Sequence, residues 1–156
     1  MPPKQPAKKG SNATSGKTTA RAKAAPAQVP IVDYLRLGAR PYLRANECAK
    51  CGARFFDRRN ACASCGGTEF RNARVKNTGR IKAFTIVRRA MPGVPVPYVS
   101  GIIETDDGTT VRGNVVGVDA DTFGFEQLGR KVKLTTWVGG TDDEGTEAVV
   151  YGYQLV

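Results

Sequence analysis

The stretch CAKCGARFFDRRNACASCG, Cys48 to Gly66, holds all four cysteines of the chain as two Cys-x-x-Cys pairs separated by ten residues. A glycine follows each pair, and glycine tolerates the positive φ of a tight turn that points backbone N–H groups at sulfur. This spacing is typical of two facing knuckles that hold a structural zinc ion in a tetrahedron of thiolates. Four protein ligands leave no coordination position for a substrate. The predicted zinc ligands are Cys48, Cys51, Cys62 and Cys65.

Two disulfides, or an iron ion in the same cage, are the alternatives for these four cysteines. A disulfide between cysteines only three positions apart is strained, and no secretory signal precedes the two pairs. No apolar run reaches the length of a membrane span. We therefore expect a cytoplasmic protein with zinc as its structural cofactor and no membrane partner.

The chain contains no histidine, which excludes a Ser-His-Asp relay, a Cys-His nucleophile and a catalytic metal held by imidazole. If the metal takes all four cysteines, no thiol nucleophile remains. Five of the 14 acidic residues gather in two turn-like clusters, 106–108 and 142–145, for which a solvated hairpin tip is the simpler interpretation. A binding or accessory subunit therefore fits the composition better than an enzyme that acts alone.

The formal net charge of +10 is concentrated at the N-terminus. Residues 1–28 hold six basic residues and no acidic one, so the rest of the chain is only mildly basic. Residues 1–30 are rich in Ala, Pro, Lys, Ser and Thr, and we expect them to form a disordered basic tail. Such a tail can bind nucleic acid or an acidic partner, although a solubilising extension is the interpretation we favour.

A short helix is predicted for residues 31–40. Ile31, Tyr34 and Leu35 recur at helical spacing, and Gly38 is placed to end the helix. A helix this short is not stable alone. We therefore expect it to dock, either on its own domain or on a partner.

The zinc ribbon completes the segment 31–73. Phe55 and Phe56 lie between the knuckles and are expected to form the hydrophobic cover of the cage. Residues 68–71, which follow the second knuckle, are expected to be the last strand of the ribbon.

Residues 74–156 show a β pattern. Side chains alternate along 81–88, prolines mark an apolar loop at 91–97, and an Asp-Asp-Gly turn joins the two strands that follow. Residues 119–128 are predicted to be a linker with Phe123 and Phe125 buried. The expected strands are 81–88, 98–105, 109–116, 130–138 and 147–155. Together with several in-strand glycines they predict a mainly β protein, a helix and four-cysteine ribbon followed by a five-stranded OB-type barrel.

The order of these motifs resembles one family, the acyl-CoA-associated OB-fold proteins with an N-terminal rubredoxin-like zinc ribbon. The resemblance covers residues 31–156, the chain without its tail. The motifs that carry it are Cys48-x-x-Cys51-Gly52, Cys62-x-x-Cys65-Gly66, Thr78-Gly79-Arg80-Ile81, Pro97-Tyr98-Val99, Asp107-Gly108 and Leu128-Gly129-Arg130-Lys131-Val132.

The resemblance implies a non-catalytic accessory subunit of a thiolase-superfamily enzyme, in a hetero-oligomer of two plus two subunits. The partner would be a thiolase, an aldolase or a hydratase, and the complex would cleave a carbon–carbon bond of an aromatic or steroid acyl-CoA. In such proteins the ribbon packs on the catalytic subunit, and the barrel lies near the acyl-CoA. Electron transfer by the ribbon is not expected, because the ten-residue spacer is far shorter than that of a rubredoxin.

The candidate acyl-CoA-binding residues lie on or beside the predicted barrel strands. Four basic residues are candidates to bind the phosphates of CoA, on the basis of their charge and strand location alone. Tyr98 ends the apolar loop, which could contact an acyl chain or a partner. The basic candidates are Lys82, Arg88, Arg89 and Arg112.

The alternative function is that of a zinc-ribbon/OB-fold nucleic-acid-binding protein. An OB surface that binds single strands presents stacking aromatics among basic residues. The mild charge of the domain argues against this function. The aromatic residues available for stacking are Phe84, Tyr98, Trp137, Tyr151 and Tyr153.

Overall fold

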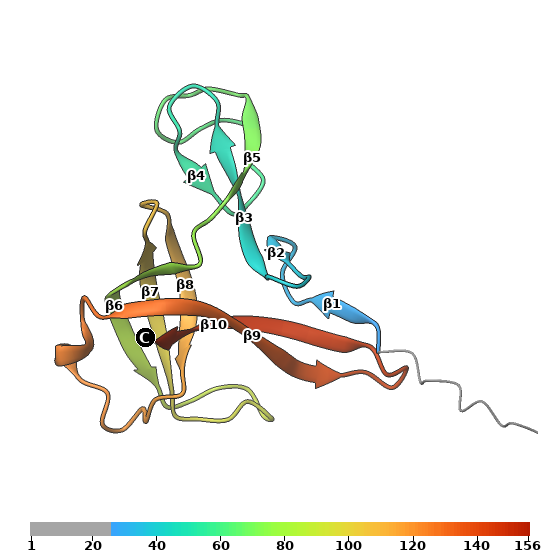
Figure 1. The fold of residues 1–156 in the computed structure, drawn as a ribbon, viewed down its shortest axis with the longest axis vertical. Helices are drawn as coiled ribbons and strands as arrows, with labels where there is room; N and C mark the ends of the chain where they lie inside the picture. The colour runs from blue at the N-terminus through green and yellow to red at the C-terminus, as the bar shows by residue number, and fades with distance from the viewer. Residues whose placement is uncertain (1–25) are drawn as a thin grey trace, which may run out of the picture.

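The computed structural model describes residues 26–156, and its regular structure is β apart from one 3-10 turn (Figure 1). Within these residues no helix is long and apolar enough to cross a membrane. The elements are β1 (Gln28–Pro30), β2 (Leu35–Arg36), β3 (Tyr42–Cys48), β4 (Arg54–Phe55), β5 (Phe70–Arg74), β6 (Thr78–Val87), β7 (Tyr98–Thr105), β8 (Thr110–Val116), η1 (Phe125–Gln127), β9 (Lys131–Thr141) and β10 (Glu147–Leu155).

Strands β6 to β10 close into a five-stranded barrel, as the sequence predicted. The order β10-β8-β7-β6-β9 returns on itself because β9 also pairs with β10. All of these pairs are antiparallel except β8 with β10. This closed ring with one parallel pair is the OB topology, and closure removes the unpaired strand edges of an open sheet.

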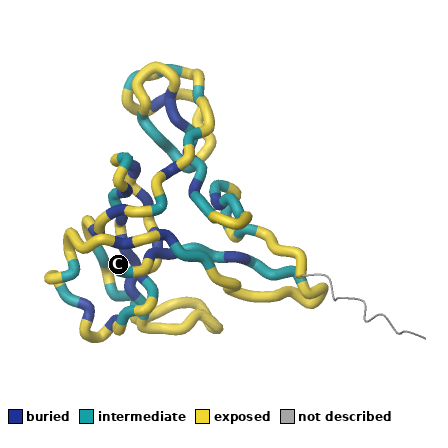
Figure 2. The backbone as a smooth tube through the Cα atoms, viewed as in Figure 1, coloured by how far each residue is buried: buried dark blue, intermediate teal, exposed yellow. Residues whose placement is uncertain are grey.

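The barrel core follows from alternation along the strands. On β8, Val111, Gly113 and Val115 are buried, while Thr110, Arg112 and Asn114 are exposed. Ile103 and Val132 complete the same core from β7 and β9. Figure 2 shows dark blue buried segments that alternate with intermediate and exposed segments in the barrel.

Two glycines let neighbouring strands approach closely. A Cβ at Gly79 on β6 would lie 2.8 Å from the Cα of Thr105 on β7. A Cβ at Gly152 on β10 would lie 2.6 Å from the carbonyl oxygen of Asn114, at the parallel contact that closes the ring. Glycine at these positions therefore permits the tight coiling of so small a barrel.

The ribbon is a second, four-stranded sheet that stands on the barrel (Figure 1). Strand β3 pairs with β5 over the register Arg44↔Arg74 to Cys48↔Phe70, and with β2 and β4 at its two ends. Residues 75–77 connect β5 directly to β6, and Val75 is fully buried. The short connection ties the orientation of the ribbon to the first strand of the barrel.

The predicted helix at residues 31–40 is wrong. The segment forms a turn and the short strand β2, because its backbone groups find partners on other strands. The N–H of Ile31 donates to Val149 on β10, and the carbonyl of Tyr34 accepts from Arg44 on β3. Leu35, which was expected on the apolar edge of a helix, is fully buried in the main core.

The described chain is already ordered within the segment expected to be tail. Strand β1 runs parallel to β10, with Val29 opposite Ala148, and Gln28 Nε2 donates to Glu147 at 2.8 Å. The remainder of the predicted basic tail, residues 1–25, lies outside the described residues.

Of the two phenylalanines predicted to be buried in the 119–128 linker, only one is. Phe123 is buried, and its ring lies 4.9 Å from that of Phe84. Phe125 opens the 3-10 turn and is 82% exposed, although its ring lies 5.8 Å from Phe84. The linker therefore covers one end of the barrel with Phe123 and presents Phe125 to the outside.

Candidate metal centre and its link to the barrel

The four cysteine sulfurs form one compact group. All four Sγ atoms lie within 4.8 Å of one another, with Cys48 to Cys65 at 3.6 Å and Cys51 to Cys62 at 3.5 Å. A zinc ion with bonds of about 2.3 Å to four thiolates sets the sulfurs roughly 3.8 Å apart. The group thus has the size of a tetrahedral zinc cage.

The two knuckles have the same backbone geometry. Gly52 and Gly66 have φ of 75° and 70°, and their N–H groups donate to the carbonyls of Cys48 and Cys62, both at 2.9 Å. The matching turns place the two Cys-x-x-Cys pairs face to face, as the sequence predicted.

The pKa values of two of the thiols, Cys51 and Cys62, shift in opposite directions. Burial raises the pKa of Cys62, but the backbone N–H groups of Ser64 and Cys65 lower it more, to about 6. The N–H of Ala53 lowers the pKa of Cys51, yet the neighbouring thiols raise it to about 12. So close a group of thiols cannot lose all its protons without a cation, and metal binding therefore releases protons.

The aromatic cover of the ribbon is smaller than predicted. Phe55 packs edge-on against Phe70, with ring centroids 6.3 Å apart. Phe56 instead lies 4.8 Å from the ring of Tyr34 and packs against the main core. Phe56 therefore fastens the ribbon to the N-terminal segment.

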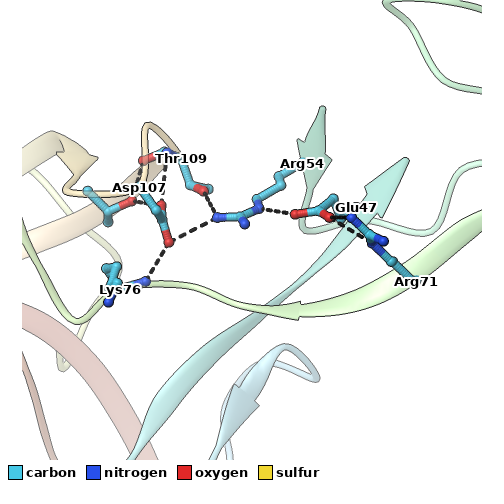
Figure 3. Close-up of polar contacts among 7 residues, drawn as sticks. Glu47, Arg54, Arg71, Lys76, Asp107 and Thr109 are labelled. Carbon is cyan, nitrogen blue, oxygen red and sulfur yellow. Dashed lines mark hydrogen bonds and ion pairs between the residues drawn. The ribbon is translucent and has the colours of Figure 1, made fainter. Parts of the chain in front are cut away.

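A chain of ion pairs joins the ribbon to the barrel (Figure 3). Arg54, on β4, has its Nε 2.7 Å from Glu47 of β3, and its Nη1 3.0 Å from Asp107 in the β7–β8 turn. The same Nη1 donates to the hydroxyl of Thr109 at 3.3 Å. Arg71 of β5 approaches Glu47 from the other side at 2.5 Å. One guanidinium thus bridges two carboxylates that belong to different domains.

Asp107 is the residue of the barrel that takes part in this series of ion pairs. Its side chain accepts from the backbone N–H of Lys76 at 2.7 Å, from the hydroxyl of Thr105 at 2.7 Å and from the N–H of Thr109 at 3.1 Å. Burial raises the pKa of Asp107, but these hydrogen bonds outweigh it and bring the pKa to about 2. Hydrogen bonds from Arg54 and Arg71 likewise lower the pKa of Glu47.

The residues predicted to bind acyl-CoA lie on different parts of the barrel. Lys82 lies on β6 and pairs with Glu104 at 2.9 Å, while Arg88 follows β6 and pairs with Asp121 at 2.6 Å. Arg89 is exposed just beyond Arg88.

Tyr98 and Arg112 complete this set on β7 and β8. Tyr98 begins β7 opposite Val87. Arg112 lines a groove of about 400 Å³ together with Tyr34, Trp137 and other residues of the N-terminal segment and β10. The structure therefore brings Arg112 beside the N-terminal segment and leaves Tyr98 by the apolar loop.

The aromatic residues do not form a continuous stacking surface. Tyr153 is fully buried, and Phe84 packs against Phe123. The Tyr151 hydroxyl donates to the carbonyl of Arg112 at 2.9 Å. Of the predicted stacking set, Trp137 is the one that ranks among the exposed large apolar side chains of the described chain.

A four-cysteine zinc ribbon joined to an OB-fold barrel defines the class of protein. Two family models match the chain: the ChsH2 rubredoxin-like zinc ribbon domain over residues 36–71, and the ChsH2 C-terminal OB-fold domain over residues 73–144. Because the two ChsH2 models match adjacent segments of the chain, the ribbon first and the barrel second, the chain belongs to the ChsH2 family. The ribbon match and the grouped cysteines make the ribbon a structural zinc site.

Among solved structures, a chain of an Ltp2-ChsH2(DUF35) aldolase is similar, with a TM-score of 0.58 and 22% sequence identity. The likeness covers 73% of this chain and 84% of that chain, and at this identity it concerns the fold. No curated protein matches the chain.

Proposed function

We propose that this chain is the non-catalytic accessory subunit of a thiolase-superfamily enzyme that cleaves a carbon–carbon bond of an acyl-CoA. The observation that carries the proposal is the pair of ChsH2-type domains. A solved structure with a similar fold is a chain of an Ltp2-ChsH2(DUF35) aldolase, which supports it. The acyl group would be an aromatic or steroid one, and the assembly would contain two copies of each subunit.

The side chains available for chemistry support a non-catalytic role. The chain has no histidine, and its four cysteines form the cage. The best-buried carboxylates, Glu47 and Asp107, are engaged with Arg54. The thiolytic or retro-aldol step would therefore depend on residues of the catalytic subunit.

The proposed division of labour gives each domain a task. Cys48, Cys51, Cys62 and Cys65 would hold the zinc ion that keeps the ribbon folded for docking. The barrel would lie beside the acyl-CoA, and the loop before β7 exposes Met91, Val94 and Val96 to a partner or an acyl chain.

Affinity purification of the tagged chain from its native host tests the proposal. The expected result is a thiolase-superfamily protein in near-equal amount, and cleavage of an acyl-CoA only when both proteins are present. A Cys62→Ser chain is the matched control, because it retains the tail and the barrel but loses a ligand of the cage. Recovery of nucleic acid or ribosomal proteins instead would show the alternative function to be correct.

A further inference from the structure

A groove at the junction of the ribbon and the barrel is lined by basic side chains. Its volume is about 570 Å³. Arg40 comes from the turn before β3, Arg74 from the end of β5 and Lys133 from β9. Three elements that are distant in the sequence thus bring three positive charges to one concave surface.

These cations have no acidic partner in the described chain. None of the three takes part in an ion pair within residues 26–156, and no carboxylate of that range lines the groove. The guanidinium of Arg74 lies 4.4 Å above the ring of Tyr42. Arg74 also stands directly opposite Arg44 on β3, and like charges in that position are destabilising. A bound anion would relieve this repulsion.

The groove also contains neutral hydrogen-bond donors. Strand β9 pairs with β6 only as far as Lys133, and the N–H of Leu134 then donates to the carbonyl of Asn77 at 2.6 Å. Alternate residues of a strand direct their N–H groups to the same edge. The N–H of Thr136 therefore faces this edge, where β9 has no further strand partner among residues 26–156, and Thr135 and Thr136 line the groove.

We infer that this groove binds a phosphate-bearing ligand, a phosphate monoester or a diphosphate. Two guanidinium groups and an ammonium group offer charge-assisted hydrogen bonds to phosphate oxygens, and the arginine fork matches phosphate geometry. A strand-edge N–H beside them suits an anion as well. The site is separate from Lys82 and Arg88, whose charges are already paired with carboxylates.

Residue-resolved NMR titration of the zinc-loaded full chain at physiological salt tests the inference. The probes are inorganic pyrophosphate, coenzyme A and pantetheine, which shares the thiol arm of coenzyme A but has no phosphate. Pyrophosphate and coenzyme A are expected to shift the amides of Thr136 and Arg74 in a saturable way, and pantetheine is expected to shift neither. Tighter binding of coenzyme A than of pyrophosphate would indicate a nucleotide as the source of the phosphate, and equal binding would indicate a free phosphate.

Variants of the groove provide the second measurement. Arg74→Gln and Lys133→Gln are each expected to weaken pyrophosphate binding by about tenfold, and they come from separate strands, so a folding defect in one leaves the other informative. Arg58→Gln removes the same charge from the loop between the two knuckles, which lines a different hollow, and it is expected to bind as the unmodified chain does.

Three outcomes would overturn the inference. The first is a shift that sodium chloride of equal ionic strength reproduces. The second is loss of binding in Arg58→Gln with no change in Arg74→Gln. The third is equal binding of poly-glutamate at the same amides, because a carboxylate ligand would then account for the groove. The test uses no catalytic subunit, so its result is independent of the proposed function.

Discussion

Among residues 26–156, Arg54 is the one side chain whose ion pairs reach carboxylates of both domains. Replacement of Arg54 with glutamine leaves Glu47 with Arg71 alone and Asp107 without an ion-pair partner. Because Arg54 is 24% exposed and the two carboxylates less, we expect a loss of about 2 kcal/mol in the free energy of unfolding. Urea denaturation of the zinc-loaded protein measures it.

A matched substitution separates this effect from the general loss of an arginine. Arg88→Gln breaks the Arg88–Asp121 pair, in which both side chains are about 60% exposed. The expected change is below about 0.5 kcal/mol. Equal losses in the two variants would mean that the contacts of Arg54 contribute no more than a surface ion pair.

The lowered pKa of Asp107 makes the junction sensitive to acid. The carboxylate is stabilised in the folded state, so its contribution is fully present above pH 4 and is lost as the pH falls toward its folded pKa of about 2. The contribution is about 2 kcal/mol. We expect the difference in stability between the unmodified chain and Asp107→Asn to shrink over this range.

Because the zinc cage also takes up protons in acid, the measured quantity is the difference between the two proteins at each pH and equal metal content. A difference that stays constant from pH 5 to pH 2.5 would contradict the assigned role of Asp107.

The cysteines could be predicted from the sequence and the ion-pair chain could not. The Cys-x-x-Cys spacing is local, so it indicates the ligands directly. Arg54 and Asp107 are 53 positions apart and meet only because β5 leads into β6 and sets the ribbon over the β7–β8 turn. An arginine beside two phenylalanines gives no sign of such a partner.

The ribbon is expected to need its metal ion to stay folded, whereas the barrel is expected to stay folded without it. The main core contains no cysteine, and it includes Leu43 and Ala45 from the first half of β3. Removal of zinc, or the substitution Cys62→Ser, is therefore expected to abolish amide protection in β4 and at the knuckle ends of β3 and β5, while the start of β3 and strands β6 to β10 remain protected. Hydrogen exchange with mass spectrometry, alongside metal analysis, measures both.

Ser64→Ala is the control for this experiment. It changes the second knuckle but keeps the backbone N–H that approaches Cys62, so it is expected to retain one metal ion and full protection. If the ribbon of the Cys62→Ser chain stayed protected, the metal would not be what holds it.

The close contact between β6 and β7 at Gly79 depends on the absence of a side chain there. A methyl group at Gly79 would clash with the backbone of Glu104 and Thr105, and backbone atoms cannot move aside as a side chain can. We expect Gly79→Ala to lower the free energy of unfolding by about 3 kcal/mol. Gly140→Ala on β9, where nothing lies within 4 Å, is expected to change it by less than about 0.5 kcal/mol.

The wrong helix shows the limit of local patterns. Ile31, Tyr34 and Leu35 have helical spacing, yet so short a helix forms too few hydrogen bonds to compete with strands already present. The N–H of Ile31 and the carbonyl of Tyr34 bond to β10 and β3 instead. Only the tertiary fold makes those partners available.

For the whole molecule, the two ends of the described chain support each other. Strand β1 extends the sheet beside β10, and Val32 packs against the core. A chain that begins at Pro26 is expected to unfold at the same temperature as the full chain. A chain that begins at Asp33 is expected to melt several degrees lower, because it loses the β1–β10 pairing. Calorimetry of the three chains tests this, and equal melting temperatures would contradict it.

The barrel as a whole could be predicted because its strands are short, alternating and separated by clear turns. Strand β7 has the predicted bounds, and the Asp-Asp-Gly turn lies where it was expected. The exposure of Phe125 could not be predicted, because which face of the linker meets the barrel depends on how the linker crosses its end.

The grouping of every cysteine of the chain in one cage has a practical consequence. A thiolate bound to zinc reacts slowly with alkylating reagents, so the metal-loaded protein has no free thiol that reacts quickly. A thiol assay of a preparation thus reports directly the fraction of molecules whose ribbon is intact. It also follows that a single cysteine introduced anywhere on the surface would be the one reactive handle for a fluorophore or a cross-linker, with no native residue to remove first.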